Sequence, residues 1–323
     1  MELWSGADAV PAGTGPTVIT MGNFDGVHRG HLTVLARVRR AADALGARAV
    51  AVTFDPHPGH VHRPDTAPAL ITGLRDRVEL LGAAGLDAVL VLEYSMEFAR
   101  QSPERFVQRY LVELLGVTRV VVGRDVRFGW RNAGTIDTMI ALGREHGFEV
   151  EVVDDVGGGD AARWSSTQLR AQLEAGDVTG AAAILGRWHR VRGVVVHGDA
   201  RGRTIGFPTA NLGAPVQGMV PADGVYAGTL RRADDGSVWP AAVSIGTNPT
   251  FDGAERRVEA YVLDRTDLDL YGVEVILELV RRLRPMTRYD GVDALVEQMH
   301  RDVAQAREVL GSPEERDSWA QAP

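Results

Sequence analysis

Two hydrophobic patterns divide this chain. In the first half, short apolar runs alternate with stretches in which apolar residues recur at the spacing of one helix face. The runs predict strands at Val18 to Met21, Ala49 to Phe54, Ala88 to Leu92, Arg119 to Val122 and Glu149 to Val153. The stretches predict helices from Leu32 to Leu45, Arg75 to Ala84, Pro103 to Leu115 and Ile136 to His146. This alternation predicts an α/β fold with a doubly wound parallel sheet, in which ligands bind at the carboxyl ends of the strands.

The pattern changes near Gly186. Strand-like segments follow one another without helices at Val191 to His197, Gly224 to Arg231, Val238 to Ile245, Val258 to Leu263 and Val273 to Val280. A helical pattern returns only between Val292 and Leu310. Such a succession is typical of an antiparallel barrel or sandwich, and we expect a C-terminal β-barrel with a C-terminal helix packed on it. The two predicted domains are residues 1–186 and 187–323.

Length and composition agree with a soluble enzyme of two domains. The chain has 323 residues, of which 45% are apolar, which is ordinary for globular proteins. It has no apolar run long enough to cross a bilayer and no signal-peptide pattern at its N-terminus. We therefore expect a cytoplasmic protein; the sequence leaves the oligomeric state open, and a homo-oligomer is compatible with it.

Charge and residue usage narrow the chemistry. The absence of cysteine rules out disulfides, thiolate nucleophiles and cysteine zinc sites. A net charge of −8 argues against nucleic acid or a membrane surface as a partner. The sequence contains arginine but no lysine. A P-loop lysine is therefore excluded, and cationic phosphate contacts must come from guanidinium groups.

The segment from Gly22 to His31 reads GNFDGVHRGH and lies where a predicted strand turns into a helix. Its glycines keep the connection small, so that backbone N–H groups and the positive end of the helix dipole favour an anion there. His28 and His31 can donate hydrogen bonds to phosphate oxygens at the same place. The alternative is a tight glycine turn with two ordinary surface histidines.

Three more motifs follow predicted strands of the first domain. They read TFDPHP at 53–58, GRDVRFG at 123–129 and WSSTQLR at 164–170. In the last, Ser165 or Ser166 can cap the helix that follows, while the hydroxyls and Arg170 meet a phosphate. Taken singly, each motif has a structural alternative: a proline turn, a glycine turn and an ordinary N-cap.

In this order, the four motifs resemble the FAD synthetase branch of the H-x-G-H nucleotidyltransferases. The resemblance implies catalytic roles for His28, His31 and Arg170. It implies ATP or phosphate contacts by Gly22, Phe24, Gly30, Ser165, Ser166 and Thr167, and flavin contacts by Phe54, His57, Asp125 and Phe128. Asp125 and Val126 depart from the family pattern, which has Asn in some members, and this change could alter a flavin or ATP contact.

The second domain carries HGDARGRT at 197–204 and GFPTANL at 206–212. The first string cannot be a Walker loop, because it lacks the lysine and leads into no helix. Its glycines still let backbone N–H groups approach a phosphate, and Thr209 and Asn211 offer oxygens suited to Mg²⁺. An ordinary loop and turn is the alternative for the glycines alone.

These strings resemble the signature of riboflavin kinase, and further matches follow at 221–226, 244–251, 257–261 and 269–272. The resemblance implies that Glu259 is the general base, although alone it could be the exposed residue of an alternating strand. It implies ATP-phosphate contacts by Gly198, Arg201, Gly202, Arg203 and Thr204, with Mg²⁺ on Thr209 and Asn211.

Together the resemblances predict a bifunctional enzyme of flavin cofactor biosynthesis. Its C-terminal domain would phosphorylate riboflavin with ATP to give FMN, and its N-terminal domain would transfer AMP from ATP to FMN, giving FAD and pyrophosphate. Two alternatives remain: an H-x-G-H transferase that uses pantetheine phosphate or glycerol phosphate, and a flavin sensor whose catalysis has decayed.

Overall fold

A computed structural model describes residues 1–154, 164–198, 202, 205–247 and 256–311. Backbone contacts divide the chain into two compact units. The first contains residues 1–69 and 74–165, and the second contains residues 70–73 and 166–323. Within the described ranges, no helix is both long and apolar enough to cross a membrane.

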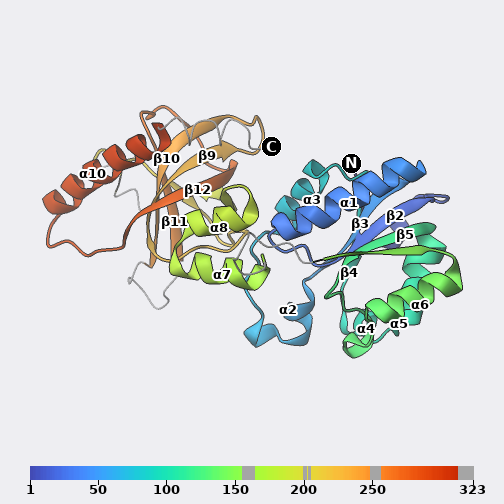
Figure 1. Ribbon diagram of the computed structural model, residues 1–323. Coiled ribbons are helices and arrows are strands. Elements are labelled where there is room, and N and C mark those ends of the chain that lie inside the picture. The colour runs from blue at the N-terminus through green and yellow to red at the C-terminus, as the bar shows by residue number, and fades with distance from the viewer. Residues whose placement is uncertain (155–163, 199–201, 203–204, 248–255, 312–323) are drawn as a thin grey trace. The chain divides into compact units, whose positions relative to one another are not determined.

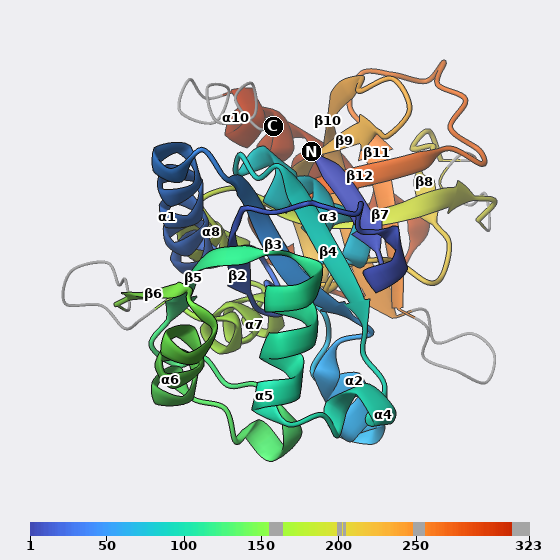
Figure 2. The same ribbon diagram turned by 90° about the vertical axis from the view of Figure 1, so that its right-hand side faces the viewer.

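The first unit is built on a parallel sheet of six strands in the order β1-β4-β3-β2-β5-β6 (Figure 2). The strands are β1 (Glu2–Ser5), β2 (Thr17–Met21), β3 (Arg48–Asp55), β4 (Ala88–Glu93), β5 (Val117–Gly123) and β6 (Glu149–Val153). The five predicted strands and their parallel pairing are confirmed. The sequence pattern missed β1, because only Trp4 of its four residues is buried.

Helices cover both faces of this sheet (Figures 1 and 2). One core joins alternate strand residues such as Val18 and Ala49 to α1 (Arg29–Leu45) and α3 (Leu74–Ala83). The other joins Ile19 and Val50 to the helical segment of α5 (Pro103–Phe106) and η3 (Val107–Leu114) and to α6 (Ile136–His146). The shorter elements are η1 (Ala7–Ala9), α2 (Pro58–His62), η2 (Pro64–Thr66), α4 (Met96–Ala99) and η4 (Trp130–Asn132). The doubly wound prediction is thereby confirmed.

The second unit contains a closed barrel in the order β10-β11-β8-β7-β12-β9, with every neighbouring pair antiparallel. Its strands are β7 (His189–Val196), β8 (Ala210–Leu212), β9 (Gly224–Arg232), β10 (Val238–Thr247), β11 (Arg256–Val262) and β12 (Glu274–Pro285). The predicted barrel is confirmed, and the short β8 is an addition that three residues were too few to predict.

In the part of the chain that the structure describes, the barrel is accompanied by the helices α7 (Ser166–Ala175), α8 (Val178–Leu185) and α10 (Val292–Gly311). The apolar face of α10 buries Val303, Ala306 and Leu310 against residues of the barrel such as Ala227 and Ala242, as predicted (Figure 1). Because α8 contacts β7 and β12, α7 and α8 belong to the second unit. The domain boundary predicted near Gly186 stays a prediction.

Candidate active sites

The loop between β2 and α1 brings the two histidines of the first motif together. His28 is the N-cap of α1 and has an extended backbone, and its Nδ1 accepts a hydrogen bond from the His31 N–H at 3.4 Å. The two rings stack with centroids 3.7 Å apart, and the ring of Phe24 meets that of His31 edge-on at 5.4 Å. His28 is buried and His31 is half-buried. Both predicted histidines therefore lie in the first turn of a long helix, where the dipole favours an anion.

Two glycines shape this loop. The Gly22 N–H donates to the Val52 carbonyl at 3.0 Å, which ties the end of β2 to β3. A Cβ on Gly30 would lie 3.1 Å from the His28 ring. That contact is tighter than van der Waals separation, so a side chain at Gly30 would disturb the stacked histidines.

The predicted flavin residues Phe54 and His57 lie at the end of β3. The ring of Phe54 packs against Tyr94 and Phe98, with centroids 5.7 and 5.8 Å away. His57 caps α2, because its Nδ1 accepts a hydrogen bond from the Gly59 N–H at 3.0 Å. Burial raises the pKa of Tyr94. The carboxyl ends of β3 and β4 thus carry an aromatic cluster of the kind on which a ring system can stack.

The other two predicted flavin residues lie in contrasting surroundings. Asp125 is exposed in the turn after β5. Phe128 is only 6% exposed, and its ring packs 6.1 Å from that of Phe106 in the core. Phe128 therefore has a core role that its motif did not indicate.

Arg77 on α3 bonds two loops that carry predicted site residues, and no sequence motif indicated it. Its side chain is almost fully buried, and it donates to the carbonyl oxygens of Asn23 and Phe54, each at 3.0 Å. Its Nη2 also lies 3.6 Å from Asp55 Oδ1. Burial lowers the pKa of Arg77, although Asp55 and Asp25 oppose that shift. The available signal was an arginine among the apolar positions of a helix whose neighbours Val78 and Leu81 are buried.

The serine motif straddles the two units. Helix α7 begins at Ser166, so Ser165 immediately precedes it and is the last residue of the first unit. Ser166 and Arg170 are half-buried and Thr167 is exposed. The prediction that α7 starts at this motif is confirmed, whereas the partnership of these residues with His28 and His31 stays a prediction.

The barrel brings three predicted residues of the kinase signature into contact. Glu259 on β11 is the register partner of Asn211 on β8 and of Ser244 on β10. The Thr209 hydroxyl donates to Glu259 Oε2 at 3.4 Å, and the Asn211 amide donates to the Thr209 carbonyl and hydroxyl at 3.2 and 3.3 Å. Glu259, Thr209 and Asn211 are each half-buried, so a ligand can reach their oxygens.

The glycines of the second-domain loop are packed too closely for any other residue. A Cβ on Gly198 would lie 2.6 Å from the Asn211 side chain, and one on Gly202 would lie 2.3 Å from the Phe207 carbonyl oxygen. Gly202 in turn accepts hydrogen bonds at its own carbonyl from Ile205 and Phe207, at 3.2 and 2.8 Å. Arg201, Arg203 and Thr204 lie outside the described residues.

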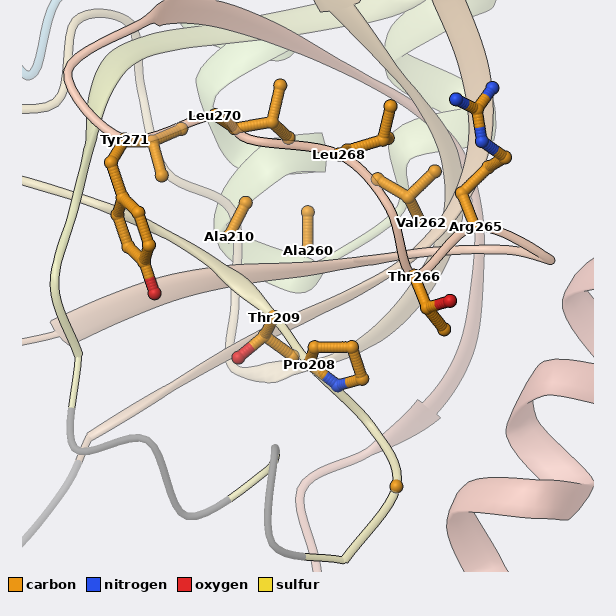
Figure 3. Close-up of a pocket in the computed structure, with 12 residues that line it drawn as sticks. Pro208, Thr209, Ala210, Ala260, Val262, Arg265, Thr266, Leu268, Leu270 and Tyr271 are labelled. Carbon is orange, nitrogen blue, oxygen red and sulfur yellow. The ribbon is translucent and has the colours of Figure 1, made fainter.

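A pocket of about 430 Å³ lies in the second unit, and Thr209 forms part of its wall (Figure 3). Its walls are mixed: apolar side chains line it together with polar atoms, which the side chains of Thr209, Arg265, Thr266 and Tyr271 help to supply. Tyr271 stacks on His197 with ring centroids 3.8 Å apart, and Arg265 bonds Asp267 at 2.7 and 2.9 Å. The lining residues are Val195, Gly206, Pro208, Thr209, Ala210, Ala260, Val262, Arg265, Thr266, Leu268, Leu270 and Tyr271. Residues of the segment 265–271 form one wall; the motif at 269–272 covers part of this segment, but the sequence analysis assigned it no role in a site.

The oxygen atoms beside the pocket can be compared with the ligands that a metal ion requires. Among the residues that the structure describes, no three His, Asp or Glu side chains form a group that could hold a metal ion. The oxygens of Thr209 and Asn211 are hard ligands of the type that Mg²⁺ prefers, and Mg²⁺ commonly binds through few protein ligands together with substrate phosphates. These residues therefore fit Mg²⁺ held jointly with a nucleotide.

The fold and the residues define a protein with two modules, a parallel sheet with an H-x-G-H loop and a barrel with a glycine loop beside a glutamate. The FAD synthetase family matches residues 11–168, and the riboflavin kinase family matches residues 185–310. The chain belongs to the family of bifunctional riboflavin kinase/FMN adenylyltransferases. It therefore carries an N-terminal FAD synthetase domain and a C-terminal riboflavin kinase domain, and is an enzyme of flavin biosynthesis.

Relatives match nearly the whole chain. The bifunctional riboflavin kinase/FMN adenylyltransferase of Pseudomonas fluorescens is 39% identical, covering 92% of this chain and 93% of its own. That of Escherichia coli strain K12 is 36% identical, covering 91% and 93%. A crystal structure of a macrolide-efflux protein from Streptococcus pneumoniae matches with a TM-score of 0.85 and 31% identity, covering 95% of this chain and 99% of its own.

Proposed function

We propose that Glu259 is the general base of riboflavin phosphorylation. The observation that carries this assignment is the contact of Glu259 with Thr209, and through it with Asn211, at the edge of the pocket. The riboflavin 5'-oxygen attacks the γ-phosphorus of ATP, its proton passes to the Glu259 carboxylate, and the bond to the β–γ bridging oxygen breaks to release ADP. The Thr209 hydroxyl orients the carboxylate that receives the proton.

The strand register supports separate sites for the two substrates of this reaction. Ala210 and Ala260 are register partners, and both line the pocket. The adjacent register pair is Asn211 and Glu259. Because side chains alternate along a strand, this second pair projects from the opposite face of the sheet. We assign the nucleoside of ATP to the pocket and riboflavin to the face of Glu259. Thr209 touches both and stands where the transferred phosphoryl group would pass.

The arginines of the glycine loop, and Mg²⁺ where the oxygen ligands would hold it, would neutralise the negative charge of the triphosphate. Backbone N–H groups around Gly198 and Gly202, together with Arg201, Arg203 and Thr204, are assigned to the phosphates. The Thr209 hydroxyl and the Asn211 carbonyl oxygen are the groups that would hold Mg²⁺. When bound, that ion supplies charge neutralisation at the transferring group.

In the N-terminal domain, the acceptor FMN phosphate is already an anion and needs no base. Its oxygen attacks the α-phosphorus of ATP, and the bond to the α–β bridging oxygen breaks to release pyrophosphate. We assign charge stabilisation to His28, His31 and Arg170, with Phe24, Gly22, Gly30 and residues 165–167 around the phosphates. The flavin is assigned to Phe54, His57, Asp125 and Phe128. Mg²⁺ as cofactor, a cytoplasmic location and a homo-oligomer stay predictions.

A pair of variants tests these assignments. Glu259→Gln should lower FMN formation by about 10²-fold or more, because the base is lost, and should leave FAD synthesis from supplied FMN intact. His31→Ala should lower FAD synthesis by about 10²-fold and leave FMN formation intact. The assay is chromatography of flavins made from riboflavin or FMN with ATP and Mg²⁺. Equal damage to both activities by either variant, in folded protein, would contradict the assignments.

A further inference from the structure

Arg77 is a buried cation that joins two loops at the carboxyl end of the first-unit sheet. It is 1% exposed and projects from α3, which contributes no residue to the sequence motifs. One of its carbonyl acceptors, Asn23, belongs to the loop that carries His28 and His31. The other, Phe54, is a predicted flavin residue at the end of β3.

The bonding pattern requires a guanidinium group. Its Nη1 reaches Asn23 and its Nη2 reaches Phe54, so two different nitrogens of one planar fork hold two carbonyls. Lysine has a single ammonium on a flexible stem and cannot reproduce this fixed separation. The Thr53 hydroxyl also donates to the Asn23 carbonyl, at 3.3 Å, so this carbonyl is the point at which the two loops are tied.

The charge of Arg77 is balanced locally. Asp55 Oδ1 lies 3.6 Å from Nη2, and the buried Asp25 also stabilises the cation electrostatically. Burying a cation is costly unless it is paired and hydrogen-bonded. An apolar side chain could fill this buried position of α3 without the cost of burying a charge. The two hydrogen bonds from Arg77 to the carbonyls of Asn23 and Phe54 are therefore the feature that needs explanation.

We propose that Arg77 is a positioning residue for FMN adenylylation. It fixes the distance between the loop assigned to the ATP phosphates and the loop assigned to the flavin, and so aligns the FMN phosphate oxygen with the α-phosphorus of ATP. The inference rests on the proposed function of these two loops. In-line transfer is sensitive to displacements of about 1 Å, which can cost about 10²-fold in rate.

The test compares Arg77→Lys and Arg77→Met with Arg75→Met as the matched control. Arg75 lies on the same helix with an exposed side chain, 3.2 Å from Glu79. We expect both Arg77 variants to lower kcat for FAD formation from FMN by about 10- to 100-fold, with a smaller change in KM. Arg75→Met should retain the wild-type kcat. Riboflavin phosphorylation by the same chains should be unchanged, and circular dichroism with thermal melting should place the assay temperature below each Tm.

Each outcome decides the question. Wild-type kcat in Arg77→Lys would overturn the proposal, because one charge would then suffice without the two-carbonyl bridge. Wild-type kcat in Arg77→Met with only a lower Tm would also overturn it, since the role would be purely structural. If Arg77→Met does not fold, Arg77→Lys, which retains the cation, carries the test. Absence of FAD formation by the wild-type chain would instead refute the proposed function of the domain.

Discussion

Gly202→Ala should impair the kinase reaction strongly, because the added methyl has no room. The Cβ would lie 2.3 Å from the Phe207 carbonyl oxygen, and an ordinary contact begins at 3.4 Å. The backbone must therefore move by the difference, 3.4 − 2.3 = 1.1 Å. Phe207 leads through Pro208 into Thr209, so this displacement reaches the residue that bonds Glu259.

The size of the effect follows from that displacement. A misplacement of about 1 Å costs about 10²-fold in rate, or about 2.7 kcal/mol of transition-state stabilisation. Overpacking should also lower the free energy of unfolding by about 1–3 kcal/mol. We therefore expect kcat for FMN formation to fall by about 10²-fold.

The assay is the initial rate of FMN formation from riboflavin and ATP, with FAD formation from supplied FMN as an internal standard. Gly291→Ala is the matched control, because a Cβ there meets no atom within 4 Å and needs no left-handed backbone. A Gly202→Ala protein that phosphorylates riboflavin at the wild-type rate would refute the reasoning from close packing.

Two further predictions concern the N-terminal domain. Phe128→Ala should lower its free energy of unfolding by about 3–5 kcal/mol, because the ring lies in the core; an unchanged urea midpoint would contradict this role. Although burial opposes ionisation of Asp87, its bonds to the Ala49 N–H and to Arg39 hold the pKa of Asp87 below its ordinary value. Its stabilising contribution is therefore complete above the unfolded-state pKa of about 3.9 and is lost as the pH falls through the lower folded-state pKa. Asp87→Asn should lower Tm at pH 7 by an amount that vanishes in acid, and a difference independent of pH would count against it.

Local sequence pattern was enough for most of the architecture. Apolar runs and helical periodicity located five of the six parallel strands, the long helices beside them and the final helix α10. The period of these patterns reflects which face of each element is buried, so it is written into consecutive residues. It failed at β1 and β8, because strands of four and three residues hold too few positions to show a period.

The motifs likewise indicated the family. His28 and His31 are neighbours in the chain, and a helix start brings them together by local geometry alone. Thr209 and Asn211 are also close in sequence. Their link to Glu259, by contrast, needs the pairing of β8 with β11 across about fifty positions of the chain.

Tertiary structure alone decided the features that depend on distant contacts. The bridge of Arg77 joins α3 to carbonyls of two loops, and the environment of Phe128 depends on Phe106. The walls of the pocket come from segments far apart in the chain, because residues of the segment 265–271 line it together with Val195 and Thr209. Sequence patterns record what each residue buries, but not which residue it meets, because that choice is made by packing elements that are far apart in the chain.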